Sequence, residues 1–269
     1  MLGFADISMN SAGWRVVFAR LGGLLGMNPL FARRNVPSVI RAGRTFLLTA
    51  LIAQGSVVTG VTANNSLQLA VSMLGELFVG FACGYVFQIY YYLLFFAGDL
   101  MDTHFGMSMA KVFDPGSSIQ MSVSSTFLNI LLMLYLFVTD SHLLMIRIFA
   151  DSFQVLPAGA FTFSQDSAKF FINLFLSTFS LVIRLVLPFM AAEFVLELSM
   201  GVLMKLIPQI HIFVINIQFK MLLGLILLLA FAGPVASFVD NYMLLMLQNL
   251  QYAFSAFLPT FSSFWFSLT

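Results

Sequence analysis

LFVGFACGYVFQIYYYLLFFAG is the sequence of Leu77–Gly98, and no residue in it carries a formal charge. About 20 consecutive apolar residues are enough for a helix to cross the hydrocarbon core of a bilayer, so this stretch predicts a membrane-spanning helix. Three further uncharged stretches are long enough to do the same: Pro115–Thr139, Met221–Val239 and Asn241–Thr269. The sequence therefore predicts a chain that crosses the membrane several times.

The composition of the whole chain agrees with this interpretation. Of its 269 residues, 60% are hydrophobic and only 9% are charged, with 32 Phe and 16 Met, whereas a soluble domain has roughly 25% charged residues. This composition excludes soluble and disordered proteins, and a net charge of +1 excludes a protein that binds nucleic acid through its charge. Cys83 is the single cysteine, so no disulfide forms within the chain.

We predict an all-α membrane protein with about six or seven helices of membrane length arranged in hairpins. The predicted helices lie near 11–28, 45–61, 67–98, 123–139 running on to 152, 169–206, 209–232 and 235–258. We expect a single integral-membrane domain over 1–269, in which 166–269 forms C-terminal helical hairpins after an N-terminal part, 1–165. Pro188 lacks a backbone donor, so we expect a kink in the helix that contains it.

Four charged residues fall within the apolar stretches: Glu76, Arg184, Glu193 and Glu197. A charge at mid-bilayer costs roughly 2.5–3.5 kcal/mol, so each of them needs a partner or an interior lined by protein. Glu193 and Glu197 share a helix face, whereas Arg184 lies about 180° away from Glu193 on an ideal helix. Two interpretations remain open, namely a proton or substrate site and contacts with other subunits.

Basic residues mark the loops expected to face the cytoplasm. Arg33, Arg34, Arg41 and Arg44 lie close together with no acidic residue among them, and short positive loops stay on the cytoplasmic side. Alternating the spans from there places 99–122 and the turn after Lys205 inside as well.

The segment 99–122 differs from the rest of the chain because it is neither a plausible span nor a solvated loop. Gly106, Pro115 and Gly116 interrupt helix formation, yet large apolar residues alternate with polar ones. Irregular backbone at membrane depth survives only where protein buries it or where it lines a cavity. Flexible Met side chains repack around irregular shapes, so the segment is a candidate gasket that seals a wide pore.

The alternative is a loop packed against its own helices. The candidate seal residues, with the Asp-Pro turn among them, are Phe105, Met107, Met109, Phe113, Asp114, Pro115, Ile119 and Met121.

No motif for catalysis or cofactor binding is present. His104, His142 and His211 are too widely spaced to suggest a metal site. Phosphate-binding, nucleophile-elbow, zinc-protease and dinucleotide motifs are also missing from the sequence. We therefore expect neither an enzyme nor a cofactor.

Several short motifs follow one another in an order and spacing typical of one family. They are Asn28–Pro37 with Arg41, then Glu76 and Gly84, Gly98-Asp99 with Gly106, Asp114-Pro115, Ser141-His142, Leu156–Gly159, and Ile207–Phe213 leading to Lys220 and Gly224. In these motifs, and over nearly its whole length, the chain resembles the FliR/SctT family of type III export-gate proteins. The motifs at 156–159 and 207–224 look closer to the flagellar branch of the family than to the injectisome branch.

The resemblance implies an export-gate subunit. Such proteins assemble with FliP, FliQ and FlhB into a channel at the flagellar basal body, in the bacterial inner membrane, and the channel passes unfolded flagellar subunits. It also implies that 105–121 corresponds to the family's pore-plugging loop and that the buried charges contact other subunits. A cytoplasmic turn that contacts a partner such as FlhB would contain Arg33, Arg34, Lys205, Pro208 and Gln209. The alternative for this turn is a plain connection between two helices. The alternatives are an injectisome subunit of the SctT type and a small-solute transporter that uses Glu76, Arg184, Glu193 and Glu197.

Overall fold

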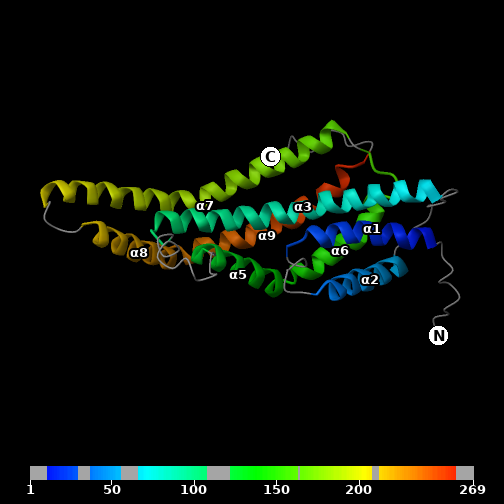
Figure 1. Ribbon diagram of the computed structural model, residues 1–269, viewed down its shortest axis with the longest axis horizontal. Coiled ribbons are helices and arrows are strands. Elements are labelled where there is room, and N and C mark those ends of the chain that lie inside the picture. The colour runs from blue at the N-terminus through cyan, green and yellow to red at the C-terminus, as the bar shows by residue number, and fades with distance from the viewer. Residues whose placement is uncertain are drawn as a thin grey trace. The chain divides into compact units, whose positions relative to one another are not determined.

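The computed structural model describes residues 11–29, 37–55, 66–107, 122–162, 164–207 and 212–258. Every regular element within those residues is an α-helix (Figure 1). The helices are α1 (Ser11–Met27), α2 (Ser38–Gly55), α3 (Ser66–His104), α5 (Val123–Val138), α6 (Ser141–Val155), α7 (Gln165–Leu206), α8 (Ile212–Ala230) and α9 (Ala232–Ser255). The predicted all-α fold class is confirmed.

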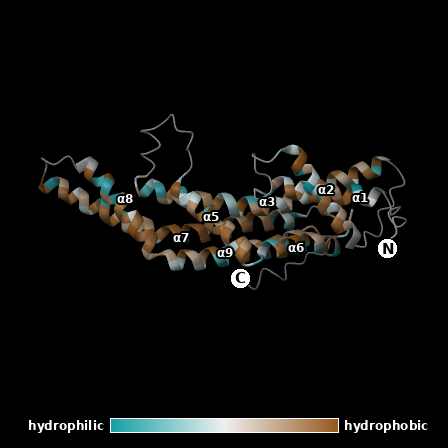
Figure 2. Cartoon of the chain, turned by 90° about the horizontal axis from the view of Figure 1, so that it is seen from below, coloured by the Kyte–Doolittle hydropathy of each residue, from teal (hydrophilic) through white to brown (hydrophobic). Residues whose placement is uncertain are grey.

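Helices α3 and α7 are long and apolar enough to cross a membrane on their own. Two further spans are available if α5 with α6, and α8 with α9, each count as one span with a bent break. Figure 2, coloured by hydropathy, shows hydrophobic residues along most of the helical ribbon. The prediction of about six or seven membrane-length helices is therefore too high, because the described residues supply two spans, or up to four.

The bent breaks have local causes. The predicted helix 123–152 is interrupted at Thr139-Asp140, where Asp140 adopts a left-handed conformation with φ 54°, which a helix cannot continue through. Helices α8 and α9 meet at a 64° bend at Phe231. Gly233 and Pro234 follow in the first turn of α9, where a missing backbone donor is tolerated.

The chain forms two compact units. Unit 1 contains residues up to Ile89, Asp140–Phe175 and the residues from Leu245 onward, and unit 2 contains Tyr90–Thr139 and Leu176–Leu244. Helices α3, α7 and α9 each contribute residues to both units. The single domain over 1–269, divided after residue 165, stays a prediction.

In unit 1, glycines allow α1 to lie directly against the first half of α3. A Cβ atom on Gly80 would collide with the backbone of Arg20, and one on Gly84 would lie 2.8 Å from the carbonyl oxygen of Leu24. Gly23 of α1 is equally close to the backbone of α3 at Leu77. Small residues allow such close approach of membrane helices.

In unit 2, aromatic side chains fill the space between helices. The Tyr242 hydroxyl donates to the carbonyl oxygen of Tyr90 at 2.8 Å, and the two ring centroids are 4.8 Å apart. Phe189 of α7 contacts Phe105 and Phe231, with centroid separations of 6.1 and 5.4 Å. Edge-to-face and tilted ring pairs of this kind are favourable arrangements in a core.

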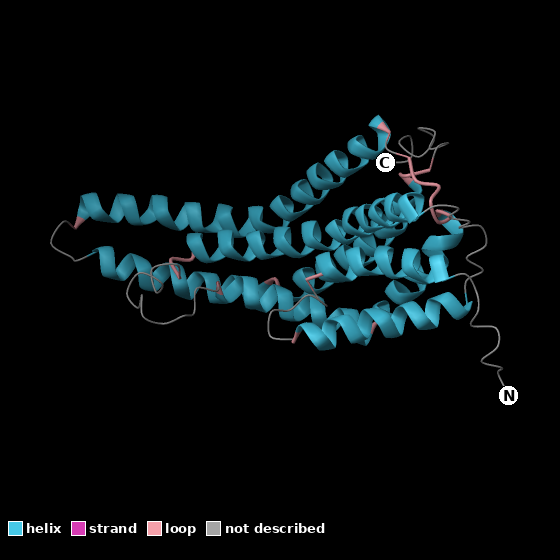
Figure 3. Ribbon diagram, turned by 45° about the vertical axis from the view of Figure 1, so that its right-hand side comes forward, coloured by secondary structure: helices cyan, strands magenta, loops and turns pink. Residues whose placement is uncertain are grey.

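Helix α7 runs without a break from Gln165 to Leu206 and contains Pro188. The helix is bent rather than straight (Figure 3), as expected for a proline inside a helix, which removes one backbone hydrogen bond.

The predicted loop at 99–122 begins later than expected. Residues 99–104 form the last turns of α3, and Phe105–Met107 form a turn. Residues 108–121 lie outside the described part of the chain, and Ser122 precedes α5. The expectation of a loop starting at residue 99 was wrong because the apolar helix continues through Asp99 and Asp102.

Candidate functional site

Described residues on either side of the segment 108–121 are joined by hydrogen bonds in unit 2. The Ser122 hydroxyl donates to Asp102 Oδ2 at 2.5 Å, and the backbone N–H of Ser124 points at both Asp102 carboxylate oxygens at 3.2 and 3.3 Å. Asp102 and Ser122 are both 1% exposed. The carboxylate satisfies a free N–H in the first turn of α5, where a negative charge is favourable.

Close packing reinforces this junction. The Ser125 hydroxyl donates to the carbonyl oxygen of Phe95 at 2.7 Å, and the Ser122 hydroxyl also lies 3.2 Å from the Gly98 carbonyl oxygen. The Ser124–Ser125 backbone packs so closely on Gly98 that a Cβ atom there would collide with it. Helix α5 therefore starts at a fixed position against the end of α3.

Phe105 anchors the start of the segment. Its ring is fully buried and packs over Gly224 of α8, where an added Cβ would lie 2.5 Å from the ring. Gly106 follows with φ 73°, a left-handed conformation suited to glycine. The chain after α3 is therefore held by the buried ring of Phe105 and then turns sharply at Gly106.

A second polar cluster lies buried in unit 1. Arg20 Nε donates to Glu76 Oε2 at 2.5 Å, and Gly159 N–H donates to Glu76 Oε1 at 2.7 Å. The Arg20 guanidinium also donates to the Ser152 carbonyl oxygen at 3.1 Å and lies 4.2 Å from the centre of the Phe153 ring. Both charged side chains are completely buried, so this pair links α1, α3, α6 and the 156–159 turn.

The acidic residues of α7 differ in their surroundings. Glu193 is 1% exposed, and neither carboxylate oxygen has a hydrogen-bond partner among the described residues. Glu197 is exposed and accepts from Lys220 of α8 at 3.2 Å. Arg184 is exposed and forms no ion pair with a described residue.

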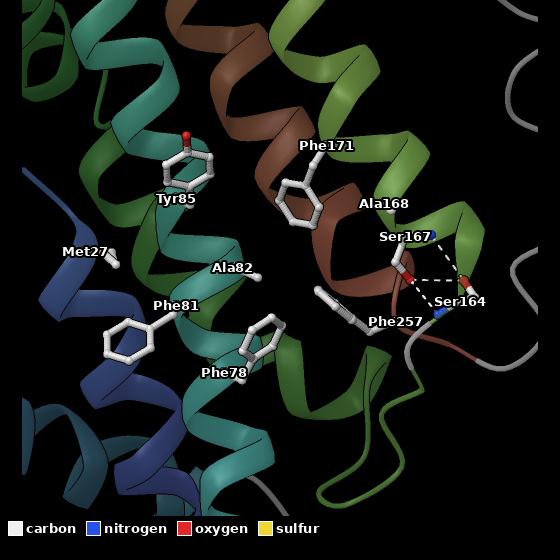
Figure 4. A pocket seen from close by; sticks show the side chains of 10 residues that line it. All are labelled: Met27, Phe78, Phe81, Ala82, Tyr85, Ser164, Ser167, Ala168, Phe171 and Phe257. Atoms are coloured by element: carbon white, nitrogen blue, oxygen red, sulfur yellow. Dashed lines mark hydrogen bonds between the residues drawn. The ribbon is translucent and has the colours of Figure 1, made fainter.

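An open apolar pocket of about 530 Å³ lies in unit 1 beside α3 and the start of α7. Phe78, Phe171 and Phe257 project toward it in Figure 4. Its polar groups, Ser164 and Ser167, bond to each other, and Ser167 also donates to the Ala256 carbonyl oxygen at 2.6 Å. The described residues contain no cluster of three metal-ligating side chains.

Comparison with known proteins decides the family. The model of bacterial export proteins, family 1, matches residues 12–246. The chain belongs to this export family. Similar proteins include the flagellar biosynthetic protein FliR of Aquifex aeolicus, which is 26% identical over 91% of this chain and 93% of its own length. FliR of Escherichia coli is 26% identical over 82% of this chain and 85% of its own, and FliR of Pectobacterium carotovorum is 28% identical over 81% and 85%.

The predicted site residues of this export-family chain are only partly within the described structure. Phe105 is buried and Met107 is half-buried. The remaining candidate seal residues lie outside the described residues: Met109, Phe113, Asp114, Pro115, Ile119 and Met121. Of the predicted cytoplasmic turn, Lys205 is exposed, whereas Arg33, Arg34, Pro208 and Gln209 also lie outside the described residues.

Sequence reasoning did not find the groups that hold these sites together. Arg20 stands out only as a charge in the first apolar helix, and nothing in the sequence pairs it with Glu76. Ser122 directly before an apolar run is a typical N-cap signal, so the start of α5 was recognisable. The partners Asp102, Gly98 and Gly224 come from other helices and leave no local pattern.

Proposed function

We propose that this chain is a subunit of the flagellar type III export gate. In this proposal it forms, with FliP and FliQ, the channel that passes unfolded flagellar subunits across the bacterial inner membrane at the basal body. The family match over residues 12–246, with relatives named as flagellar biosynthetic proteins, carries the proposal. The chain acts as part of a conduit and contributes no catalytic group.

The exposed surface supports assembly with other membrane helices. Large apolar side chains remain exposed along every described helix, as expected for a chain that contacts lipid and neighbouring subunits. Arg184 and Glu193 lack partners within the described residues, and such charges in apolar helices require partners. We assign Arg184 to a contact with another subunit, together with the exposed Glu197. Glu193 is 1% exposed, so its carboxylate does not reach the surface where another subunit would bind. Glu76 does not need such a contact to account for its burial.

We further propose that 105–121 seals the channel at rest. Asp102 and Ser122, on either side of this segment, are hydrogen-bonded to each other, and the buried ring of Phe105 packs over Gly224. A short segment anchored at both ends and rich in Met and Phe suits a seal that deforms when cargo passes. FlhB is the partner proposed for the turn that contains Arg33, Arg34, Lys205, Pro208 and Gln209.

Purification of the assembled complex tests the proposed function. A tagged version of this chain, co-expressed with FliP and FliQ, should yield one discrete assembly in detergent that contains all three proteins. Its native mass gives the copy number of each protein. Recovery of a monomer or homodimer without FliP and FliQ would overturn the proposal.

Ion conductance tests the seal. Replacing Met107, Met109 and Phe113 with Gly should make resting cells leak ions, because the side chains proposed to fill the channel are removed. Met204→Gly, at an exposed methionine near the end of α7, is the matched control and should not leak. Unchanged conductance in the triple variant would exclude the gasket role.

A further inference from the structure

Five polar residues recur every three or four positions along the first part of α7 and therefore share one side of the helix. All five are exposed. They define the α7 polar face: Lys169, Asn173, Ser177, Ser180 and Arg184.

Arg184 is the residue on this face that most needs a partner. It is the only formally charged residue between Lys169 and Glu193, and it has no ion pair or hydrogen bond to a described residue. Lys169, by contrast, pairs with Asp166 at 3.4 Å. Because Arg184 lies well inside the apolar stretch, its side chain is poorly placed to reach the water interface as residues near helix ends do.

The remaining surface of this part of α7 is suited to lipid, and the α7 polar face is not. Ile172, Phe175 and Phe179 are exposed apolar residues on other sides of the same turns. In a membrane-spanning helix, polar side chains face protein or water rather than hydrocarbon. Beyond Pro188 the same side of α7 becomes apolar at Ala191, Val195 and Leu198, so the polar surface has a defined end.

We propose that the α7 polar face is the docking surface for one transmembrane helix of another subunit, and that this helix carries an Asp or Glu side chain opposite Arg184. Charge complementarity carries the choice of partner, because a carboxylate is the group that satisfies an unpaired guanidinium with two hydrogen bonds. Asn173 and Ser180 supply further hydrogen bonds of the kind that join membrane helices. This inference rests on the proposed function, since it needs an assembled gate.

Photocrosslinking in the assembled complex tests the position of the partner. With p-benzoylphenylalanine at Ser180, we expect an adduct whose peptide comes from a transmembrane helix of another subunit that contains Asp or Glu. The same probe at Phe175, on the opposite side of α7, is the matched control and should not give that adduct. An equal adduct from both positions, or none from Ser180 in an intact complex, would overturn the inference.

Solvent accessibility separates a docked helix from a water-filled path. Ser180→Cys in a Cys83→Ala background should resist a membrane-impermeant maleimide in the complex. Rapid labelling at this position would mean that the α7 polar face lines an aqueous pathway, which contradicts the inference.

A charge exchange tests the proposed ion pair. Arg184→Glu should lower the yield of the Ser180 adduct by about tenfold or more, because like charges then face each other, and Arg184→Lys should retain most of it. Changing the carboxylate of the crosslinked helix to Arg should restore the adduct in the Arg184→Glu background. Failure of this rescue in a complex that still contains FliP and FliQ would overturn the inference and leave the proposed function intact. Loss of the wild-type complex itself would overturn the proposed function instead.

Discussion

Ser122 Oγ donates a hydrogen bond to the Asp102 carboxylate at 2.5 Å, and these two residues stand on either side of the segment 108–121. The bond joins the end of α3 to the start of α5.

Asp102→Asn should destabilise unit 2. The amide keeps one acceptor but brings an N–H₂ group against donors that pointed at the carboxylate, and leaving a buried group unsatisfied costs about 1–3 kcal/mol. Thermal unfolding of the purified complex measures the change. Asp166→Asn removes an exposed pair with Lys169 and should change stability by less than about 1 kcal/mol. Equal shifts for the two variants would contradict a structural role for Asp102.

Breaking the Arg20–Glu76 pair should be strongly destabilising. Glu76→Gln leaves the Arg20 charge completely buried without a carboxylate, and removal of one partner of a buried pair costs about 3–5 kcal/mol. The double variant Arg20→Met with Glu76→Leu removes both charges and should recover part of that loss. Denaturant unfolding of the wild type, Arg20→Met, Glu76→Leu and the double variant gives the coupling energy. Losses that simply add in the double variant would show that the two side chains act independently.

Gly224→Ala should displace the ring of Phe105. The added Cβ would lie 2.5 Å from the ring, and forcing extra volume into a packed site costs about 1–3 kcal/mol. Gly201→Ala is the matched control, because nothing lies within 4 Å of the added atom. That control should be neutral or stabilising by up to about 1 kcal/mol through helix propensity. Differential scanning calorimetry distinguishes the two. Phe105→Leu should partly rescue Gly224→Ala, whereas in the Gly201→Ala background it should only lower stability, because a buried ring is lost.

Gly80→Ala should push α1 away from α3. The new methyl group would meet the backbone of Arg20, which cannot rotate aside as a side chain does, so the loss should be at the upper end of about 1–3 kcal/mol or beyond. Gly22→Ala on α1 has open space around the added atom and should be tolerated. The melting temperatures of the two variant complexes in detergent compare Gly80→Ala with Gly22→Ala directly. Equal melting temperatures would rule out close backbone packing at Gly80.

Much of the fold could be predicted from local sequence. The apolar runs located α3 and α7 and the region of α9, and Pro188 explained the bend in α7. The number of spans was overestimated because run length does not reveal where a helix turns. Asp140, in a left-handed conformation, interrupts one apolar run, and the bend at Phe231 interrupts another.

The candidate site was predicted only in outline. The unusual composition of 99–122 marked the segment, yet the sequence placed its start too early and gave no reason to single out Asp102. Likewise, Glu76 was recognised as a costly charge, but its partner Arg20 lies on another helix. Such pairings depend on which helix faces pack together, and a local sequence pattern does not indicate how distant helices pack.

The sequence by itself determined that this chain is an all-helical membrane protein, because hydrophobicity and helix formation depend on neighbouring residues along the chain. Only the tertiary structure decided which charges are satisfied and which are not. Arg20 meets Glu76, and Ser122 meets Asp102, because close packing at Gly80 and Gly98 fixes the helices at short range. Arg184, by contrast, remains exposed and forms no ion pair with a described residue.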